Sequence, residues 1–318
     1  MRLVVLKLSS KAVRGGLTEH TQMNPNHPED VVSAILKKNS VIRFRFTFRI
    51  AQITMTKHPA KLLASRFSLW LCAVLWLVSG QATAQALSQS VTVAVASNFT
   101  APMQQIAQVF ERDTGYQAKL SFGGTGSLYA QIRNGAPFDV FLAADTQTPA
   151  KLVREQLAQA DTRFTYAIGQ LVLWSADSKR VDDGGAVLRD DTFRKIAMAD
   201  PKLAPYGAAA KQVLEGMGLY RQIKPKIVQG KNIGQTFQFV SSGNAALGFV
   251  ALSQVYRDGE LTAGSGWLVP SDQYDPIKQD AVLLAAAQDN QAALALMDYL
   301  KGDEARKIIE SFGYRKSP

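Results

Sequence analysis

Two apolar stretches constrain the fold of this 318-residue chain more than any other feature. The first reads FTYAIGQLVLWSA over 164–176, and the second reads YDPIKQDAVLLAAA over 274–287. Each is longer than most single strands, so each can cross from one body of the protein to another. Between and around them, short apolar runs alternate with helical periods, which is typical of α/β folds. The pattern predicts two α/β lobes joined by a double-crossing hinge, with a ligand cleft between them.

The first lobe is expected to be discontinuous, with residues 87–167 plus 277–318, and the second lobe to comprise 168–276. Hydrophobic periodicity gives the elements of both lobes. Strands are expected over 91–97, 117–122, 138–145, 196–199, 226–228 and 246–250. Helices are expected over 100–114, 127–134, 149–156, 205–216, 233–242, 292–301 and 303–311.

The formal net charge of +10 suggests nucleic acid or an anionic membrane as a partner, but its distribution argues against both. Residues 1–84 carry 12 of the 36 Lys and Arg and only 3 of the 26 Asp and Glu. The remaining 24 basic and 23 acidic residues therefore nearly cancel. The basic excess belongs to the N-terminal segment, and we expect no nucleic-acid partner.

The distribution of histidine and cysteine excludes several kinds of chemistry. His20, His27 and His58 are the three histidines, Cys72 is the single cysteine, and neither type occurs from residue 85 onward. Cys-His and Ser-His-Asp catalysis, zinc sites built on His or Cys, and disulfides are thereby excluded from that part of the chain. Ser97 or Thr125 as a nucleophile would lack a base, so an enzyme is not expected.

The segment from Met55 has the organisation of a Sec-type signal peptide. A basic start leads into the uncharged apolar run 67–78, and Ala82-Thr83-Ala84 supplies small residues for cleavage. That run is short for a transmembrane helix. We interpret 55–84 as a signal peptide and 1–54 as a non-native upstream extension, and expect a periplasmic protein without stable membrane insertion.

A glycine-rich loop, SFGGTGSLYAQI over 121–132, joins an expected strand to an expected helix. A Walker A loop would need a lysine that is absent here, and a Rossmann fingerprint would need glycine where Tyr129 stands. A nucleotide is therefore disfavoured. What remains is a helix start with room for a close ligand and with hydroxyl donors, an arrangement that suits an anion.

Three other segments repeat this arrangement of a strand followed by a helix start. Ser97 and Asn98 follow the first strand, whereas Tyr206 and Ile233 open helices of the second lobe. The C-terminal edge of α/β strands is where ligands bind, so we expect these residues and Thr125 to form one site of neutral N–H and O–H donors. Donors alone favour an oxyanion without a proton, such as sulfate, molybdate or tungstate. The O–H of HPO₄²⁻ would face another donor, at a cost of about 1–3 kcal/mol.

At these residues the sequence resembles the periplasmic molybdate-binding proteins of ABC transporters, over about 87–316. The resemblance is carried by AVASNFTAPMQQIAQVFERDTG, SFGGTGSLYAQIRNGAPFDVFLAAD, RFTYAIGQLVLWS, DPKLAPYGAAAKQVL, GKNIGQTFQFV and AALGFVALSQV. It implies a type II substrate-binding fold that closes on molybdate or tungstate without a metal ligand from the protein. Family contacts fall on Ser97, Thr125, Tyr206 and Ile233, with a further N–H from Asn98.

The resemblance also implies the partners and leaves two other ligands open. We expect a monomer that needs no cofactor and delivers its oxyanion to a membrane permease. Sulfate stays an alternative, because cavity size decides between the oxyanions. Fe³⁺ is another, held by Tyr166, Tyr206 and Asp145. Some family members bind through a Tyr at the position of Ala251, so this chain is similar to the subgroup that uses Tyr206.

Overall fold

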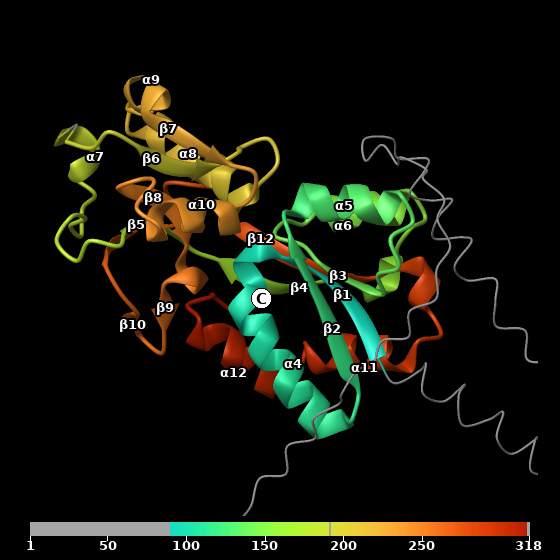
Figure 1. Cartoon of the computed structure of the whole chain (residues 1–318). Helices are drawn as coiled ribbons and strands as arrows, with labels where there is room; N and C mark the ends of the chain where they lie inside the picture. The colour runs from blue at the N-terminus through green and yellow to red at the C-terminus, as the bar shows by residue number, and fades with distance from the viewer. Residues whose placement is uncertain (1–89, 191, 317–318) are drawn as a thin grey trace, which may run out of the picture. The chain divides into compact units, whose positions relative to one another are not determined.

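The computed structural model describes residues 90–190 and 192–316 and contains two five-stranded sheets (Figure 1). The first sheet has the order β2-β1-β3-β12-β4, and the second has the order β11-β5-β8-β6-β7. The strands of the first sheet are β1 (Ser90–Ala96), β2 (Gln117–Gly123), β3 (Val140–Leu142), β4 (Phe164–Gly169) and β12 (Ile277–Leu283). Those of the second are β5 (Leu171–Ser175), β6 (Ile196–Ala199), β7 (Ile227–Gly230), β8 (Leu247–Ala251) and β11 (Ser265–Leu268).

Helices are distributed along the whole described part of the chain, as an α/β fold requires. The α-helices are α4 (Thr100–Thr114), α5 (Thr125–Arg133), α6 (Gln147–Arg154), α7 (Val187–Asp190), α8 (Pro205–Gly216), α9 (Tyr220–Ile223), α10 (Ile233–Ser241), α11 (Gln291–Tyr299) and α12 (Asp303–Ser311). Short 3-10 turns are η1 (Ser97–Phe99), η2 (Ala160–Thr162), η3 (Lys224–Lys226), η4 (Leu252–Gln254) and η5 (Ala285–Ala287). A small hairpin pairs β9 (Tyr256–Arg257) with β10 (Glu260–Leu261).

The first sheet is covered by helices on both faces (Figure 1). β1 runs parallel to β2 and β3, whereas β12 runs antiparallel to β3 and β4. Side chains alternate between faces along β1. Val93 and Val95 pack with α4, α11 and α12, and Ala94 packs with α5 and α6. Burial on both faces explains why these strands read as continuous apolar runs.

The second sheet has the same plan. β6 runs parallel to β7 and β8, and β5 runs antiparallel to β8 and β11. One face packs against α8, with Leu214 in its core, and the other packs against α10 through Val240. Two sheets of this kind confirm the predicted α/β fold with two lobes.

The first long apolar stretch crosses between the sheets, as predicted. β4 ends at Gly169 in the first sheet, and β5 begins at Leu171 in the second. The second stretch also crosses, since Tyr274 lies in the core of the second lobe and its hydroxyl accepts the Leu171 N–H at 3.1 Å, whereas β12 belongs to the first sheet. Only 277–283 of this stretch forms a strand. Pro276 stands directly before it, and a proline has no N–H to donate to a ladder.

Several element bounds agree with the sequence. α4, α8, α12 and β6 have the predicted bounds, and most others differ by one to three residues. One difference matters for the site: α5 begins at Thr125, two residues earlier than expected, with Gly124 in extended conformation as its N-cap. Thr125 is therefore the first residue of the helix, where N–H groups have no partner within the helix.

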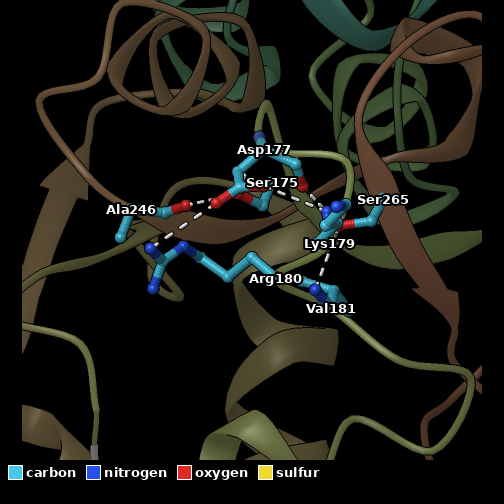
Figure 2. Close-up of polar contacts among 7 residues, drawn as sticks. All are labelled: Ser175, Asp177, Lys179, Arg180, Val181, Ala246 and Ser265. Atoms are coloured by element: carbon cyan, nitrogen blue, oxygen red, sulfur yellow. Dashed lines mark hydrogen bonds and ion pairs between the residues drawn. The ribbon is translucent and has the colours of Figure 1, made fainter.

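The edge strand β11 is held by a polar cluster that the sequence did not reveal (Figure 2). Ser265 Oγ donates to the carbonyl oxygen of Asp177 at 2.6 Å and accepts the Val181 N–H at 3.0 Å. Ser175 Oγ donates to the Ala246 carbonyl oxygen at 2.6 Å. These bonds fix the loop that leaves β5 against the neighbouring strands.

The predicted upstream extension (1–54) and signal peptide (55–84) lie outside the described residues. Within 90–190 and 192–316, no helix has the length and apolar character needed to cross a membrane.

Candidate functional site

A small cavity brings together the ends of strands from both sheets. Its empty volume is about 220 Å³, with open solvent at its mouth included. It is lined by Ala96, Ser97, Asn98, Gly123, Gly124, Thr125, Ala144, Ala204, Pro205, Tyr206, Asn232 and Ile233. All five residues predicted to bind an oxyanion are in this set. Their contact with a ligand stays a prediction, but the structure brings them to one place.

The first lobe contributes two hydroxyl groups. Ser97 directly follows β1, and Thr125 opens α5 after the parallel neighbour β2. Thr125 is 3% exposed, and its Oγ1 accepts the Ala144 N–H at 3.0 Å. Because that N–H occupies one side of the oxygen, the hydroxyl hydrogen of Thr125 is available to another acceptor.

The second lobe contributes two helix starts. Pro205 is the first residue of α8 and has no N–H, so Tyr206 carries the first free N–H of that helix. Ile233 opens α10, and the N-cap side chain of Asn232 accepts the Gln235 N–H at 2.9 Å. The first turn of each helix exposes N–H groups and a partial positive charge.

The two lobes contact each other at this cavity. The Gly234 N–H donates to Ser97 Oγ at 3.2 Å, and Ser97 Oγ donates to Asn232 Oδ1 at 3.4 Å. A Cβ atom built on Gly124 would lie 3.0 Å from Asn232 Cβ. Ser97 and Gly124 from one lobe therefore meet Asn232 and Gly234 from the other, and the structure is closed around the cavity.

Asn98 lies differently from the other predicted residues. It is 2% exposed, and its Nδ2 donates to Gln279 Oε1 at 2.8 Å and to Tyr314 Oη at 2.9 Å. The amide nitrogen is committed to these bonds, and the amide oxygen Oδ1 is buried without a hydrogen-bond partner among the described residues. Only the backbone N–H of Asn98 is then left for a ligand, as the sequence had suggested.

Gln279 is a buried residue that sequence reasoning missed. It is fully buried on β12, and its Nε2 donates to Tyr206 Oη at 3.0 Å. Its Oε1 accepts from Asn98 and, at 3.0 Å, from the hydroxyl of Tyr166. A signal was present, because Gln279 and Asp280 interrupt an otherwise apolar run. Buried polar residues of this kind are retained when they are fully hydrogen-bonded.

The cavity contains no full charge. Of its lining residues, only Tyr206 is ionisable. Burial raises the pKa of Tyr206 well above the usual value for tyrosine, and the neighbouring Tyr314 adds to this shift. The hydroxyl therefore stays protonated and can donate. A dianion would meet only O–H and N–H donors, with its charge dispersed over helix starts rather than opposed by a buried cation.

The residues considered for Fe³⁺ do not form one site. Tyr206 lines this cavity, whereas Asp145 and Tyr166 line two other pockets. Asp145 Oδ1 and Oδ2 accept the backbone and side-chain donors of Thr148 at 2.7 and 3.0 Å. Among the residues that the structure describes, no group of three or more His, Cys, Asp and Glu could hold a metal ion.

Comparison with known proteins identifies the family of this chain. A family model described as bacterial extracellular solute-binding protein matches residues 91–315. The molybdate-binding protein ModA of Azotobacter vinelandii is 57% identical over 241 residues, which cover 76% of this chain and 96% of that protein. ModA of Rhodobacter capsulatus is 48% identical over 261 residues, covering 82% of this chain and 99% of that protein.

A solved structure gives the same result at the level of the fold. The structure described as the Azotobacter vinelandii periplasmic molybdate-binding protein superposes with a TM-score of 0.70 at 40% identity. The match covers 72% of this chain and 100% of that one. The fold is therefore the two-lobed type II fold of periplasmic substrate-binding proteins, and the chain belongs to the ModA family of bacterial extracellular solute-binding proteins.

Proposed function

We propose that this protein binds molybdate or tungstate in the periplasm and delivers the anion to the membrane permease of an ABC importer. The observation that carries the proposal is the closed cavity lined by neutral donors from both lobes. The names of the relatives from Azotobacter vinelandii and Rhodobacter capsulatus support the choice of ligand.

The proposed ligand contacts are Ser97, Asn98, Thr125, Tyr206 and Ile233, through hydroxyl groups and backbone N–H groups. Four oxygens of a tetrahedral dianion can each accept from more than one of these donors. The protein would hold the metal through its oxygens, without a direct bond to it. Residues 87–167 with 277–318 would close as one lobe on residues 168–276 as the other.

We also propose that the protein is a monomer that acts only by binding, with no cofactor of its own and no nucleic-acid partner. Hydrolysis at Ser97 or Thr125 would need a general base, and the described cavity offers none among its lining residues. The proposed signal peptide at 55–84 supports export to the periplasm.

A calorimetric titration of the purified protein with molybdate, tungstate, sulfate and phosphate tests the proposal. Molybdate and tungstate should bind tightly and phosphate should not, because its proton would face a donor. At a thousandfold excess over Kd, the bound anion should raise the free energy of unfolding by about 4 kcal/mol. Tight binding of sulfate with weaker binding of molybdate would show that sulfate, and not molybdate, is the ligand. Binding of none of the four would refute the proposal.

A further inference from the structure

The hydroxyl group of Tyr206 belongs to the second lobe, but its hydrogen-bond partners belong to the first. Tyr206 is the second residue of α8 and is 1% exposed. Its Oη accepts from Nε2 of Gln279 on β12 at 3.0 Å. The hydroxyl of Tyr314, which follows α12, is also hydrogen-bonded to it. One residue of the second lobe is therefore bonded to two buried side chains of the first.

These two bonds account for the Tyr206 hydroxyl within the protein. A tyrosine hydroxyl has one hydrogen to donate and accepts through its oxygen. The amide of Gln279 acts as the donor, and the Tyr314 hydroxyl has an acceptor of its own in the Asn98 carbonyl oxygen at 2.9 Å. The backbone N–H of Tyr206, at the start of α8, is then the group that this residue offers to an anion in the cavity.

Gly169 leaves the space in which the bond between the lobes forms. It is the last residue of β4, directly before the crossing to the second lobe. A Cβ atom on Gly169 would overlap Tyr206 Oη and lie 2.6 Å from Gln279 Nε2. Gly169 is not among the glycines with positive φ, so the close approach, and not the backbone conformation, requires glycine here.

Tyr166 provides a comparison within the same cluster. Its hydroxyl lies 3.0 Å from Gln279 Oε1 and 3.1 Å from the Ala143 carbonyl oxygen, and the residue is buried like Tyr206. Tyr166, Ala143 and Gln279 all belong to the first lobe. Two buried tyrosines therefore share one glutamine, but the bond of Tyr206 crosses between the lobes and those of Tyr166 do not.

We propose that Tyr206 is a positioning residue whose hydroxyl docks into the first lobe when the cleft closes and so holds the start of α8 at the ligand. Its bond to Gln279 stabilises the closed form relative to the open form. The apparent affinity of a ligand that binds the closed form rises with the population of that form. The hydroxyl would therefore strengthen binding of every enclosed anion by the same factor, without touching any of them. This inference rests on the proposed function, because it is measured through anion binding.

The substitution Tyr206→Phe tests the proposal, since it removes the hydroxyl and keeps the ring. In the closed form, Gln279 Nε2 would then lack its partner. Affinity for molybdate should fall by about tenfold, the effect of one unpaired buried group. Affinity for tungstate, and for sulfate if the wild type binds it, should fall by the same factor. Tyr166→Phe is the matched control, which should lower the melting temperature but leave molybdate affinity unchanged.

A double-mutant cycle with Gly169→Ala tests whether the hydroxyl acts through the first lobe. The added methyl group would occupy the space of the bond, so Gly169→Ala alone should weaken molybdate binding. In the Tyr206→Phe background the bond is already absent, and Gly169→Ala should have a smaller effect than in the wild type.

Calorimetric titrations give each affinity, and a thermal melt without ligand shows that each variant is folded. The proposal is overturned if Tyr206→Phe binds molybdate as tightly as the wild type, or if Tyr166→Phe weakens binding to the same extent. It is also overturned if Tyr206→Phe weakens binding of two anions by different factors, or if the effects of Gly169→Ala and Tyr206→Phe are additive. If Gly169→Ala does not fold, the comparison of the two phenylalanine variants decides. Failure of the wild-type protein to bind molybdate would instead refute the proposed function.

Discussion

At the scale of single residues, the proposed site depends on neutral N–H and O–H donors rather than on charge. Ser97, Thr125 and Tyr206 each have an oxygen occupied by an N–H donor. An anion with only acceptor oxygens is matched to a cavity lined by neutral donors. In the proposed function, residue chemistry therefore sets the class of ligand before cavity size selects among its members.

Thr125 gives the simplest test at this scale. Thr125→Val keeps the shape of the side chain but removes the hydroxyl and leaves the buried Ala144 N–H without a partner. We expect molybdate affinity to fall by about tenfold or more and the free energy of unfolding to fall by about 1–3 kcal/mol. Thr125→Ser retains the hydroxyl and is the matched control. Calorimetry and denaturant unfolding measure the two effects, and equal affinities for Val and Ser would show that the hydroxyl does not contact the ligand.

The buried tyrosines predict how stability depends on pH. Burial raises the pKa of Tyr206 and Tyr166 well above the usual value, with Tyr314 adding to both shifts. The unfolded chain releases these protons near pH 10, while the folded chain keeps them. This contribution to stability is therefore intact below pH 10 and is lost as the pH rises above it. Urea unfolding at pH 8, 9.5 and 10.5 should show the decline, and Tyr166→Phe should make it shallower. A stability that rises above pH 10 would contradict the assignment.

At the scale of elements, the starts of α5 and α10 approach each other across the cleft. Gly124 is the N-cap of α5, and Asn232 is the N-cap of α10. The absence of a side chain at Gly124 permits this approach, since a Cβ there would lie 3.0 Å from Asn232 Cβ. Gly124 has φ −75° and ψ 142°, a conformation open to any residue. Glycine is therefore required at position 124 because the cleft is closed, and not because of the local backbone conformation.

Gly124→Val should therefore impair closure without disturbing either lobe. We expect molybdate affinity to fall by about tenfold or more. The added side chain would be overpacked only when the lobes close, and overpacking costs about 1–3 kcal/mol. The melting temperature without ligand should change little. Gly216→Ala, at a position with nothing within 4 Å of the added Cβ, is the control and should bind normally. An unchanged affinity for Gly124→Val would show that closure does not bring α5 and α10 together.

The elements also show what the sequence could predict. α4, α8 and α12 have a clear apolar face and a recognisable start or end, and their bounds were predicted to the residue. β11 was missed because it is four residues long and contains Gly266, so no alternation is visible. The residues that line the cavity could be predicted from the helix starts. Each of these helices follows a strand, and ligands of α/β sheets bind at the C-terminal edge of the strands. Gln279 was not predicted as part of the site, because its bonds depend on β12 lying between β3 and β4.

At the scale of the whole described molecule, two similar sheets hold the site between them. In each sheet, the parallel strands place helix starts at one edge, and the crossing from β4 to β5 links the two sheets at Gln170. Neither lobe alone supplies the full set of donors, because Ser97 and Thr125 belong to the first and Tyr206 and Ile233 to the second. Ligand binding and lobe closure are therefore one event in this account.

A crystal structure of the protein with tungstate tests this central claim most directly, because the heavy metal atom locates the ion without ambiguity. The account predicts the ion in the cavity between the lobes, with its oxygens at hydrogen-bond distance from hydroxyl and N–H groups of Ser97, Thr125, Tyr206 and Ile233. Tungstate bound to a Lys or Arg side chain, or bound on one lobe outside the cavity, would contradict it.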